Sequence, residues 1–493
     1  MPPHGDAISP GEVLGRLGST LRAHSYDDAH LRLRLGRIPD RLTTATLATA
    51  ERRTGDDQLG LLIRFWCLGL PAAGDEIEAI LGGTESADLE RSGLIVRTGA
   101  EAAAAVRISP AGDRLLVHDF DRASRLSKEH VIGVSPATRT LAGLTPRNHV
   151  RRALDIGTGC GAQAIDLAAH AESVVATDIS ERAAWATRAS AALNGIDHLE
   201  VRIGDGLAPV ADEQFDLVVS NPPFVVSPAA EVTFRDAGTR GDAMSRSLVR
   251  DVVTHLRPAG VACVLVNWIV RAGESVTAAA ETWLDDLPVK ALLLQHEALA
   301  PAAYAQRWPL LPADASIEEH RATTDRWLAE LERLGARSVA SGAVVMERTD
   351  GHGAVRVVKM PRRPADGGPQ VRRMLDAMGR FSGPDDTALG STRFRLVHGH
   401  RIDQRLHYGH GSYKAAPARM RMDQSAGVEV RVPPELLEAV FGFDAGSTIG
   451  DVTAEVAAGR GQPEAGLEAA LRPLVLELYE LGVLEALESP RET

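Results

Sequence analysis

The fold of this chain is decided by the stretch Ala153-Leu154-Asp155-Ile156-Gly157-Thr158-Gly159-Cys160-Gly161. An apolar run of the kind that forms a buried strand leads into three alternate glycines, and a helical pattern follows. Glycine lets the backbone approach a ligand where a side chain would obstruct it. The stretch therefore predicts a strand, a tight ligand-binding turn and a helix. Taken alone, it also fits a phosphate-binding dinucleotide loop, or a turn that serves packing only.

Outside this stretch, short β-branched runs alternate with helical stretches from about residue 150 onward. We expect strands at 152–156, 173–177, 200–203, 217–220, 261–267 and 290–295, and helices at 163–170, 181–194 and 244–256. The alternation predicts an α/β fold, a doubly wound Rossmann-like domain that binds ligands at the carboxyl ends of its strands. Ser316 and Glu319 have the spacing of a capping box and open a helix within an expected insertion at 298–335.

A length of 493 residues exceeds what one hydrophobic core supports and predicts roughly three domains. We expect an N-terminal, mostly helical module at 1–115, the α/β domain at 116–360 and a C-terminal module at 361–493. In both flanking modules a helix, a glycine and a strand follow one another, at 87–96 and at 476–484. This pattern is similar to the last helix and wing of a winged-helix module. A helix-glycine-strand turn that serves packing alone fits it at least as well.

Composition excludes several classes of protein. Hydrophobic residues make up 44% of the chain, which is ordinary for a globular protein and excludes a disordered one. No uninterrupted apolar run reaches the ~18 residues that cross a bilayer, and the N-terminus lacks the basic stretch and apolar core of a secretory signal. We therefore expect a soluble, cytoplasmic protein with no membrane partner.

Cysteine and histidine do not predict a metal site. The cysteines at 67, 160 and 263 lie too far apart in the sequence to suggest a disulfide framework or a zinc site, so we interpret them as packing residues. Four histidines lie close together in an Arg-rich segment: His398, His400, His407 and His410. No Cys or well-placed Glu completes a ligand set, and the arginines repel a cation. We expect no metal there, and favour a solvated or anion-binding hairpin.

The net charge of −12 hides a strong asymmetry. Residues 356–421 contain 14 Lys and Arg against 5 Asp, which makes this segment +9 and leaves the rest of the chain at −21. Charge segregated in this way predicts a phosphate-bearing or acidic partner at 356–421.

Acidic residues follow the strands next to the glycine loop. Asp178 ends the second strand, where a carboxylate accepts hydrogen bonds from ribose hydroxyls, and Asp205 ends the third, where it could accept from an adenine amino group. With Asp155 they make an acidic pocket. Such a pocket suits the cationic sulfonium and ammonium groups of S-adenosylmethionine better than the anionic pyrophosphate of a dinucleotide.

Together with 215–224, these segments resemble the successive motifs of class I S-adenosylmethionine-dependent methyltransferases. The resemblance implies S-adenosyl-L-methionine as the cofactor. It implies that the cofactor is bound by Asp155, Gly157, Thr158, Gly159, Gly161, Asp178, Asp205, Gly206, Asn221 and Thr140. One departure is Arg139, which stands where the family usually has an acidic residue before the threonine.

The tetrad Asn221-Pro222-Pro223-Phe224 at the end of the fourth strand is predicted to carry the chemistry. An amide or exocyclic amino nitrogen attacks poorly because its lone pair is delocalised. The Asn221 side-chain carbonyl and the Pro222 backbone carbonyl can accept its two N–H groups and stabilise positive charge that develops on the nitrogen. The prolines stiffen the loop, and Phe224 offers a flat face for stacking.

The tetrad and the segments 225–228, 231–232, 240–242 and 244–246 look like those of HemK-type release-factor glutamine methyltransferases. That likeness covers about a third of the chain, roughly 131–267. It implies an N-methyltransferase acting on a protein glutamine side chain. The alternative is a ribosomal or transfer RNA base, at guanine N2 or adenine N6, and a small-molecule amine comes third.

Overall fold

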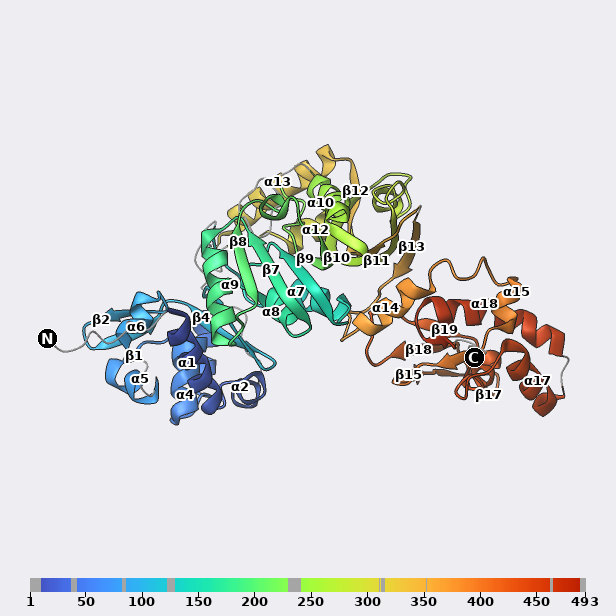
Figure 1. Cartoon of the computed structure of the whole chain (residues 1–493), viewed down its shortest axis with the longest axis horizontal. Coiled ribbons are helices and arrows are strands. Elements are labelled where there is room, and N and C mark those ends of the chain that lie inside the picture. Colours follow the sequence, from blue (N-terminus) through green and yellow to red (C-terminus); the bar gives the residue numbers. More distant parts are fainter. Residues whose placement is uncertain are drawn as a thin grey trace.

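The structure is a computed structural model. It describes residues 10–36, 42–81, 86–121, 129–228, 241–309, 311, 315–351, 353–461 and 464–487. Figure 1 shows three parts in a row along the long axis, namely an N-terminal module in blue, a central sheet in green and yellow, and a C-terminal module in orange and red. Within the described residues, no helix is both long and apolar enough to span a membrane.

The central domain is built on an eight-stranded sheet in the order β13-β11-β12-β10-β9-β6-β7-β8. Its strands are β6 (Val150–Ile156), β7 (Ala171–Asp178), β8 (Leu199–Ile203), β9 (Phe215–Ser220), β10 (Leu256–Arg271), β11 (Val289–Leu299), β12 (Ala336–Arg348) and β13 (Ala354–Lys359). β12 runs antiparallel to both neighbours, and the other pairs are parallel. The chain changes direction across the sheet between β6 and β9, which is where such sheets bind ligands. The predicted doubly wound α/β fold is confirmed.

Helices cover both faces of this sheet (Figure 1). They are α7 (Pro136–Leu144), α8 (Ala162–Ala168), α9 (Glu181–Leu193), α10 (Ala243–Asp251) and α11 (Ala278–Glu281), with 3-10 turns η2 (Ala208–Val210) and η3 (Val252–His255). Alternate residues of β6 point to opposite faces, so Ala153 packs in one core with α7 and α8 while Leu154 packs in the other with α10. The helix expected at 244–256 ends at Asp251 and continues as the turn η3.

The insertion between β11 and β12 consists of α12 (Pro301–Arg307) and α13 (Ile317–Arg333). The predicted capping box is present, because Ser316 Oγ accepts from the Glu319 N–H at 3.2 Å and Glu319 Oε2 accepts from the Ser316 N–H at 2.7 Å. The first residues of the expected insertion, 298 and 299, complete β11 instead.

The N-terminal module combines helices with short antiparallel strands. Its helices are α1 (Pro10–Ala23), α2 (Asp28–Leu35), α3 (Thr44–Glu51), α4 (Gln58–Leu62), the π-helical turn η1 (Ile63–Cys67), α5 (Gly74–Leu81) and α6 (Ser86–Arg91). Its strands are β1 (Ala72–Ala73), β2 (Ile95–Thr98), β3 (Glu101–Ala104), β4 (Arg107–Ala111) and β5 (Arg114–His118). β1, β3 and β2 form one sheet in that order, and the β2-β3 hairpin follows α6 directly. The winged-helix-like character of this module stays a prediction.

The N-terminal module is attached to α9 of the central domain. The expected boundary after residue 115 falls inside β5, whose Val117 N–H donates to Ser190 Oγ at 2.8 Å. From α1, the Arg22 guanidinium donates to the Leu193 carbonyl at 3.0 Å. Ala189 and Leu193 belong to the same buried cluster as the core of the module. This module and the helix beside the glycine loop therefore share one core.

The C-terminal module has its own core but also covers part of the sheet. Its helices are α14 (Gly368–Ala377), α15 (Thr387–Ser391), η4 (Pro434–Leu436), α16 (Leu437–Phe441), α17 (Ile449–Arg460) and α18 (Glu464–Glu480). Its strands are β14 (Phe394–Leu396), β15 (His400–Asp403), β16 (Leu406–Gly409), β17 (Ser412–Ala415), β18 (Ala418–Met422), β19 (Val430–Val432) and β20 (Leu484–Ala486). Met374 and Leu375 of α14 are fully buried in the cluster that lies under the central sheet.

Residues 361–369 are rich in Pro, Gly and Arg, a composition typical of a linker, but the end of this segment is buried against the central domain. The Gly367 N–H donates to the Gly143 carbonyl at 2.7 Å, and α14 already begins at Gly368. Gln370 is fully buried; it donates to the Leu481 carbonyl at 2.7 Å and accepts from the Ala426 N–H at 2.8 Å. The Gly367–Gly143 hydrogen bond and the buried side chains of α14 therefore hold the C-terminal module against the central domain, while Gln370 ties α14 to the rest of its own module.

Candidate active site

A cleft of about 890 Å³ lies at the carboxyl ends of β6, β7, β8 and β9. It brings together most of the residues predicted from the sequence. Its lining includes Asp155, Gly157, Thr158, Gly159, Asp178, Asp205, Gly206, Asn221, Pro222 and Pro223. The size is within the usual range for a pocket that encloses a small-molecule ligand.

The glycine loop has a backbone that only glycine adopts without strain. Gly157, Gly159 and Gly161 have φ angles of +70°, +59° and +83°. A Cβ added to Gly157 or Gly159 would meet no protein atom within 4 Å, whereas one added to Gly161 would lie 3.0 Å from the Thr187 side chain. The first two glycines therefore leave open backbone beside the cleft, and Gly161, which is not among the lining residues, allows the loop to pack on α9.

Asp178 holds the glycine loop against the start of α9. Its Oδ2 accepts from the Gly159 N–H and its Oδ1 from the Ser180 N–H, both at 2.9 Å. Burial raises the pKa of this carboxyl above its usual value, while the backbone N–H groups of Ser180 and Gly159 oppose the shift. Each carboxylate oxygen has further acceptor capacity, which fits hydroxyl groups of a ligand in the cleft.

Asp155 is a buried carboxyl at the cleft wall. Its Oδ2 accepts from the Ala164 N–H at 3.1 Å, whereas Oδ1 is buried without a hydrogen-bond partner among the described residues. Burial, with a smaller contribution from the charge of Asp178, raises the pKa of Asp155 to about 7. A cation bound in the cleft would favour the ionised form of this carboxyl.

Asp205 has an exposed side chain and lies at the turn after β8. This turn is tied to the neighbouring strand, because the Gly204 N–H donates to the Asp178 carbonyl at 2.9 Å and Thr177 Oγ1 donates to the Gly206 carbonyl at 3.0 Å. Asp178 and Asp205 are thereby held at the same edge of the sheet.

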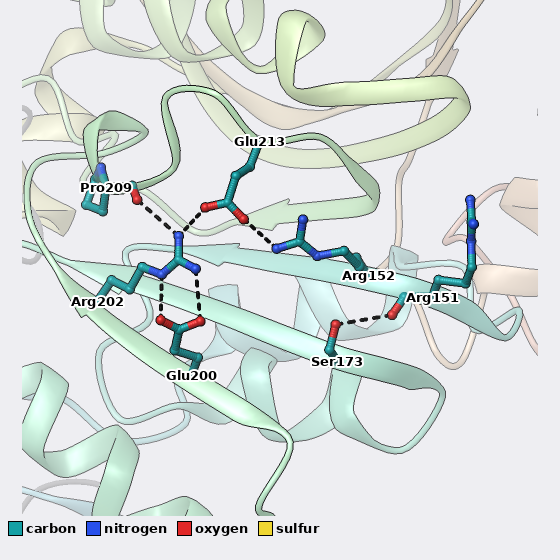
Figure 2. A network of polar contacts seen from close by, with 7 residues as sticks. All are labelled: Arg151, Arg152, Ser173, Glu200, Arg202, Pro209 and Glu213. Carbon is teal, nitrogen blue, oxygen red and sulfur yellow. Dashed lines mark hydrogen bonds and ion pairs between the residues drawn. The ribbon is translucent and has the colours of Figure 1, made fainter.

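A network of ion pairs secures the loop that follows Asp205. Figure 2 shows Glu213 between the guanidinium groups of Arg202 and Arg152, with Arg202 also bound to both carboxylate oxygens of Glu200. Arg202 donates in addition to the Pro209 carbonyl at 3.2 Å. Hydrogen bonds from the two arginines help to lower the pKa of the Glu213 carboxyl. The network connects β6 and β8 to the 204–213 loop and limits how far Asp205 can move.

Asn221 and Pro222 follow β9 directly. Ser220 Oγ donates to the Ile156 carbonyl at 2.9 Å and ties the end of β9 to the strand that carries the glycine loop. The Asn221 side chain is half-buried and makes no hydrogen bond within the part of the chain that the structure describes. Its amide is therefore available to a ligand in the cleft.

The insertion supports the loop after Pro223. Phe224 is not among the cleft-lining residues; its ring lies edge-on to Trp308 with 6.3 Å between centroids. The Tyr304 hydroxyl, which is buried, accepts from the Val226 N–H at 3.0 Å and from Asn267 Nδ2 at 3.1 Å. Tyr304 therefore packs in a core and anchors this loop.

Besides Gly161 and Phe224, one more residue predicted for the site, Thr140, does not line the cleft. Its hydroxyl donates to the Pro136 carbonyl at 3.0 Å, and Thr138 lines the cleft instead. Residues 231–232 and Arg240, part of the family likeness, lie outside the described residues.

His130, Asp251 and His255 also line the cleft but were missed, because no motif marks them. His130 lies 3.9 Å from Asp119, and His255 lies near Asp251. Tertiary packing alone brings these two histidines to the cleft.

The charge of the cleft wall fits S-adenosylmethionine. The acidic lining residues are Glu129, Asp155, Asp178, Asp205 and Asp251. The lone arginine among the lining residues, Arg250, pairs with Asp286 at 2.7 Å. The unpaired Asp155 Oδ1 and the open glycine backbone fit a ligand that carries positive charge and hydroxyl groups. Among the described residues, no group of three or more His, Cys, Asp or Glu could hold a metal ion.

Comparison with known protein families matches residues 131–276 to the methyltransferase small domain. The central segment is a class I methyltransferase domain. The match contains the glycine loop, all three strand-end aspartates and the Asn221 loop. Residues 28–105 match a domain of unknown function (DUF7059).

The methyltransferase domain is similar to several curated proteins that are named as methyltransferases. The Xylella fastidiosa release factor glutamine methyltransferase is 34% identical over 122 residues, 22% of this chain and 44% of that protein. The Bradyrhizobium diazoefficiens ribosomal protein uL3 glutamine methyltransferase is 33% identical over 124 residues, 22% and 39% of the two chains. The Alcanivorax borkumensis ribosomal RNA small subunit methyltransferase C is 30% identical over 138 residues, 27% and 39%. The chain thus spans less than half the length of these relatives.

Proposed function

We propose that this protein is an S-adenosylmethionine-dependent methyltransferase that acts on a planar nitrogen. The observation that carries the proposal is the position of Asn221 and Pro222. They line the same cleft as Asp155 and Asp178, and the Asn221 amide has no partner among the described residues. An acceptor-binding group therefore lies next to a site built for a cationic, hydroxyl-bearing ligand.

The cofactor residues divide into three roles. Asp178 accepts hydrogen bonds from ribose hydroxyls, Asp205 accepts from the adenine side, and the open backbone of Gly157 and Gly159 permits close approach. Asp155 supplies negative charge at the buried end of the cleft. When bound, S-adenosylmethionine supplies an electrophilic methyl group on a cationic sulfur.

We assign Asn221 to the acceptor rather than to the set of cofactor residues that the family resemblance implied. Together with Pro222 it orients the acceptor. The Asn221 side-chain carbonyl and the Pro222 backbone carbonyl accept the two N–H groups of a planar amide or amino group, which sets the direction of its lone pair. The same two acceptors stabilise positive charge on the nitrogen as its bond to carbon forms. Proline at 222 and 223 removes two backbone donors that would compete for these acceptors.

A protein glutamine side chain is the first acceptor class. Two of the relatives described above are named as glutamine methyltransferases. An RNA base is the second, since a third relative is named as a ribosomal RNA methyltransferase. The basic segment at 356–421 supports this second class because it would attract phosphates.

Labelled methyl transfer tests the proposal. The purified full chain is incubated with S-adenosylmethionine labelled on the methyl group and with a lysate, and the products are divided between protease and ribonuclease treatment. Label that protease releases identifies a protein acceptor, and label that ribonuclease releases identifies RNA. Label that survives both treatments identifies a small molecule and overturns both acceptor classes.

The matched control is Asn221→Ala, which should bind the cofactor normally by calorimetry and transfer little label. If the wild-type chain binds no S-adenosylmethionine, the cofactor assignment is wrong. If Asn221→Ala transfers label at the wild-type rate, the proposed role of the Asn221 loop is wrong.

A further inference from the structure

A small hairpin of the C-terminal module is exposed on both of its faces. β16 and β17 pair with each other alone among the described strands, and the turn between them is His410-Gly411 with φ angles of +51° and +78°. A turn with two positive φ angles matches the twist of a two-stranded hairpin and makes its register definite. Apart from the half-buried Gly409, every residue from 405 to 415 is exposed.

One face of the hairpin presents two tyrosines whose rings contact each other at a tilt. Tyr408 is directly opposite Tyr413 across the strands, and their ring centroids are 5.1 Å apart at an interplanar angle of 58°. The two residues are 69% and 71% exposed, and Leu406 on the same face is 61% exposed. Large apolar side chains gathered on an open surface mark an interaction site.

The other face is basic. His407 lies opposite Lys414, and Arg405 precedes β16. No acidic residue occurs in the sequence between Asp403 and Asp423. Arg405 and Lys414 form no ion pair or side-chain hydrogen bond with any residue that the structure describes. Their charges are therefore available to an anionic partner.

Elsewhere in the basic segment, much of the positive charge is already neutralised. The ion pairs are Arg356–Glu480, Arg362–Glu429, Arg372–Glu347, Arg372–Asp376, Arg395–Glu485, Arg401–Asp423, Arg419–Glu429 and Arg421–Asp403. Because a paired arginine exerts little field at a distance, the excess of +9 counted from the sequence overstates the attraction of the whole segment. The hairpin combines unpaired cations with exposed aromatic rings.

We propose that this hairpin binds single-stranded nucleic acid. Unpaired bases offer flat faces that stack on Tyr408 and Tyr413, and phosphates contact Arg405 and Lys414 on the opposite face where the strand passes round the edge of the two-stranded hairpin. A duplex hides its base faces, and an acidic peptide offers carboxylates but no rings for the tyrosine pair. The inference concerns what the hairpin holds, and it does not depend on which nitrogen the active site methylates.

Binding is measured with the full chain and without any methyl donor. The probe is a fluorescein-labelled oligouridylate of about 12 nucleotides, a length within the range that such sites cover. The same oligonucleotide of deoxyuridine, a duplex of equal length and poly-glutamate serve as comparison ligands. Fluorescence anisotropy should show binding of both single strands at low salt and weaker binding of the duplex and of the peptide.

Tyrosine variants separate stacking from simple apolar contact. The double variant Tyr408→Ala/Tyr413→Ala should lose roughly tenfold or more in affinity, because base stacking on each aromatic ring is lost. Tyr408→Phe/Tyr413→Phe retains both rings and should bind as the wild type does. Tyr408→Leu/Tyr413→Leu retains apolar area without a flat ring, and should bind as poorly as the alanine variant.

Charge variants use a matched control. Arg405→Gln/Lys414→Gln should weaken binding and reduce the slope of log affinity against log salt by about 1.4, the value for two phosphate contacts on a single strand. Arg395→Gln/Arg460→Gln removes the same charge from two arginines that pair with Glu485 and Glu438, and should leave the slope unchanged. Thermal unfolding checks that all variants keep the wild-type fold.

Three results would overturn the proposal. They are absence of RNA and DNA binding at low salt, equal binding of poly-glutamate, and hairpin variants that bind as tightly as the wild type. Asn221→Ala should bind RNA normally. If the wild-type chain binds RNA but transfers no methyl group to any acceptor, the proposed enzymatic function fails while the hairpin assignment stands.

Discussion

The Asp178 carboxylate accepts the Gly159 backbone N–H at 2.9 Å, so the acid that ends β7 also holds the middle glycine of the loop after β6. Its second oxygen accepts from the Ser180 N–H. One side chain thus fixes two ligand-binding segments and retains acceptor capacity for a ligand.

Asp178→Asn should weaken S-adenosylmethionine binding by roughly 10- to 100-fold, since the amide has a single oxygen and loses the charge-assisted hydrogen bonds. Isothermal titration calorimetry measures the change. The control is Asp197→Asn, whose side chain is 99% exposed outside the cleft. Equal affinities for the wild type and Asp178→Asn would remove Asp178 from the cofactor site.

Cofactor binding should tighten as the pH rises through about 7, the pKa of Asp155. Below that value the carboxyl is largely protonated, and above it the carboxylate attracts a cation in the cleft. Calorimetry at several pH values between about 6 and 8 should show proton release on binding. Asp155→Asn should abolish both the trend and the proton release; persistence of either would mean that another group is responsible.

Asp155 should also make the ligand-free protein less stable as the pH rises. Its folded pKa of about 7 lies above the ordinary value of 3.8, so the folded chain holds a proton that the unfolded chain releases. The contribution of Asp155 to the free energy of unfolding therefore falls as the pH rises from about 4 to about 7. At pH 8, Asp155→Asn should be more stable than the wild type by about 2–4 kcal/mol in urea denaturation, whereas at pH 4 the two should nearly coincide.

Asn221→Ala should lower kcat by about 10²- to 10³-fold while the affinity for S-adenosylmethionine stays unchanged, because the lost carbonyl stabilises charge that develops only during transfer. Asn221→Asp retains an oxygen at the same place but adds charge and removes the NH₂ group. Its kcat should therefore lie between those of the wild type and Asn221→Ala. The measurement is single-turnover transfer to the acceptor found in the lysate experiment. An unchanged kcat in Asn221→Ala would contradict the mechanism.

Tyr304→Phe should slow methyl transfer, because it removes the hydroxyl that anchors the loop after Asn221. It leaves the Val226 N–H and Asn267 Nδ2 without their acceptor at the buried hydroxyl, at a cost of about 1–3 kcal/mol in unfolding free energy. The matched control is Tyr26→Phe, which removes a buried hydroxyl bound to the Ile108 carbonyl at 2.7 Å. Both variants should lose stability, but only Tyr304→Phe should lower kcat. A similar kcat in the two variants would limit Tyr304 to a role in packing.

Local sequence was sufficient for much of the central domain. The apolar run before Gly157 and the positive φ angles of Gly157 and Gly159 are requirements of a short segment, so residue pattern alone predicts them. The strand-end aspartates could be placed at one edge because parallel strands meet there. The resemblance to a family motif implied a cofactor contact for Thr140, but Thr138 lines the cleft instead, because two residues correspond to about half a turn of α7 and place the two side chains on opposite faces of the helix.

Other features depend on contacts between distant segments. Burial raises the pKa of Asp155, and this burial arises because β6 lies between β7 and β9 and is covered by α8. No local sequence pattern predicts how completely the carboxyl is excluded from water. The Tyr304 anchor joins residues 78 positions apart. Likewise, the basic segment was recognisable from charge counts, but which of its cations are unpaired depends on acids such as Glu480, 124 positions from Arg356. Residue pattern thus established the α/β domain and its candidate ligand groups, whereas tertiary packing decided which groups are buried, paired or exposed.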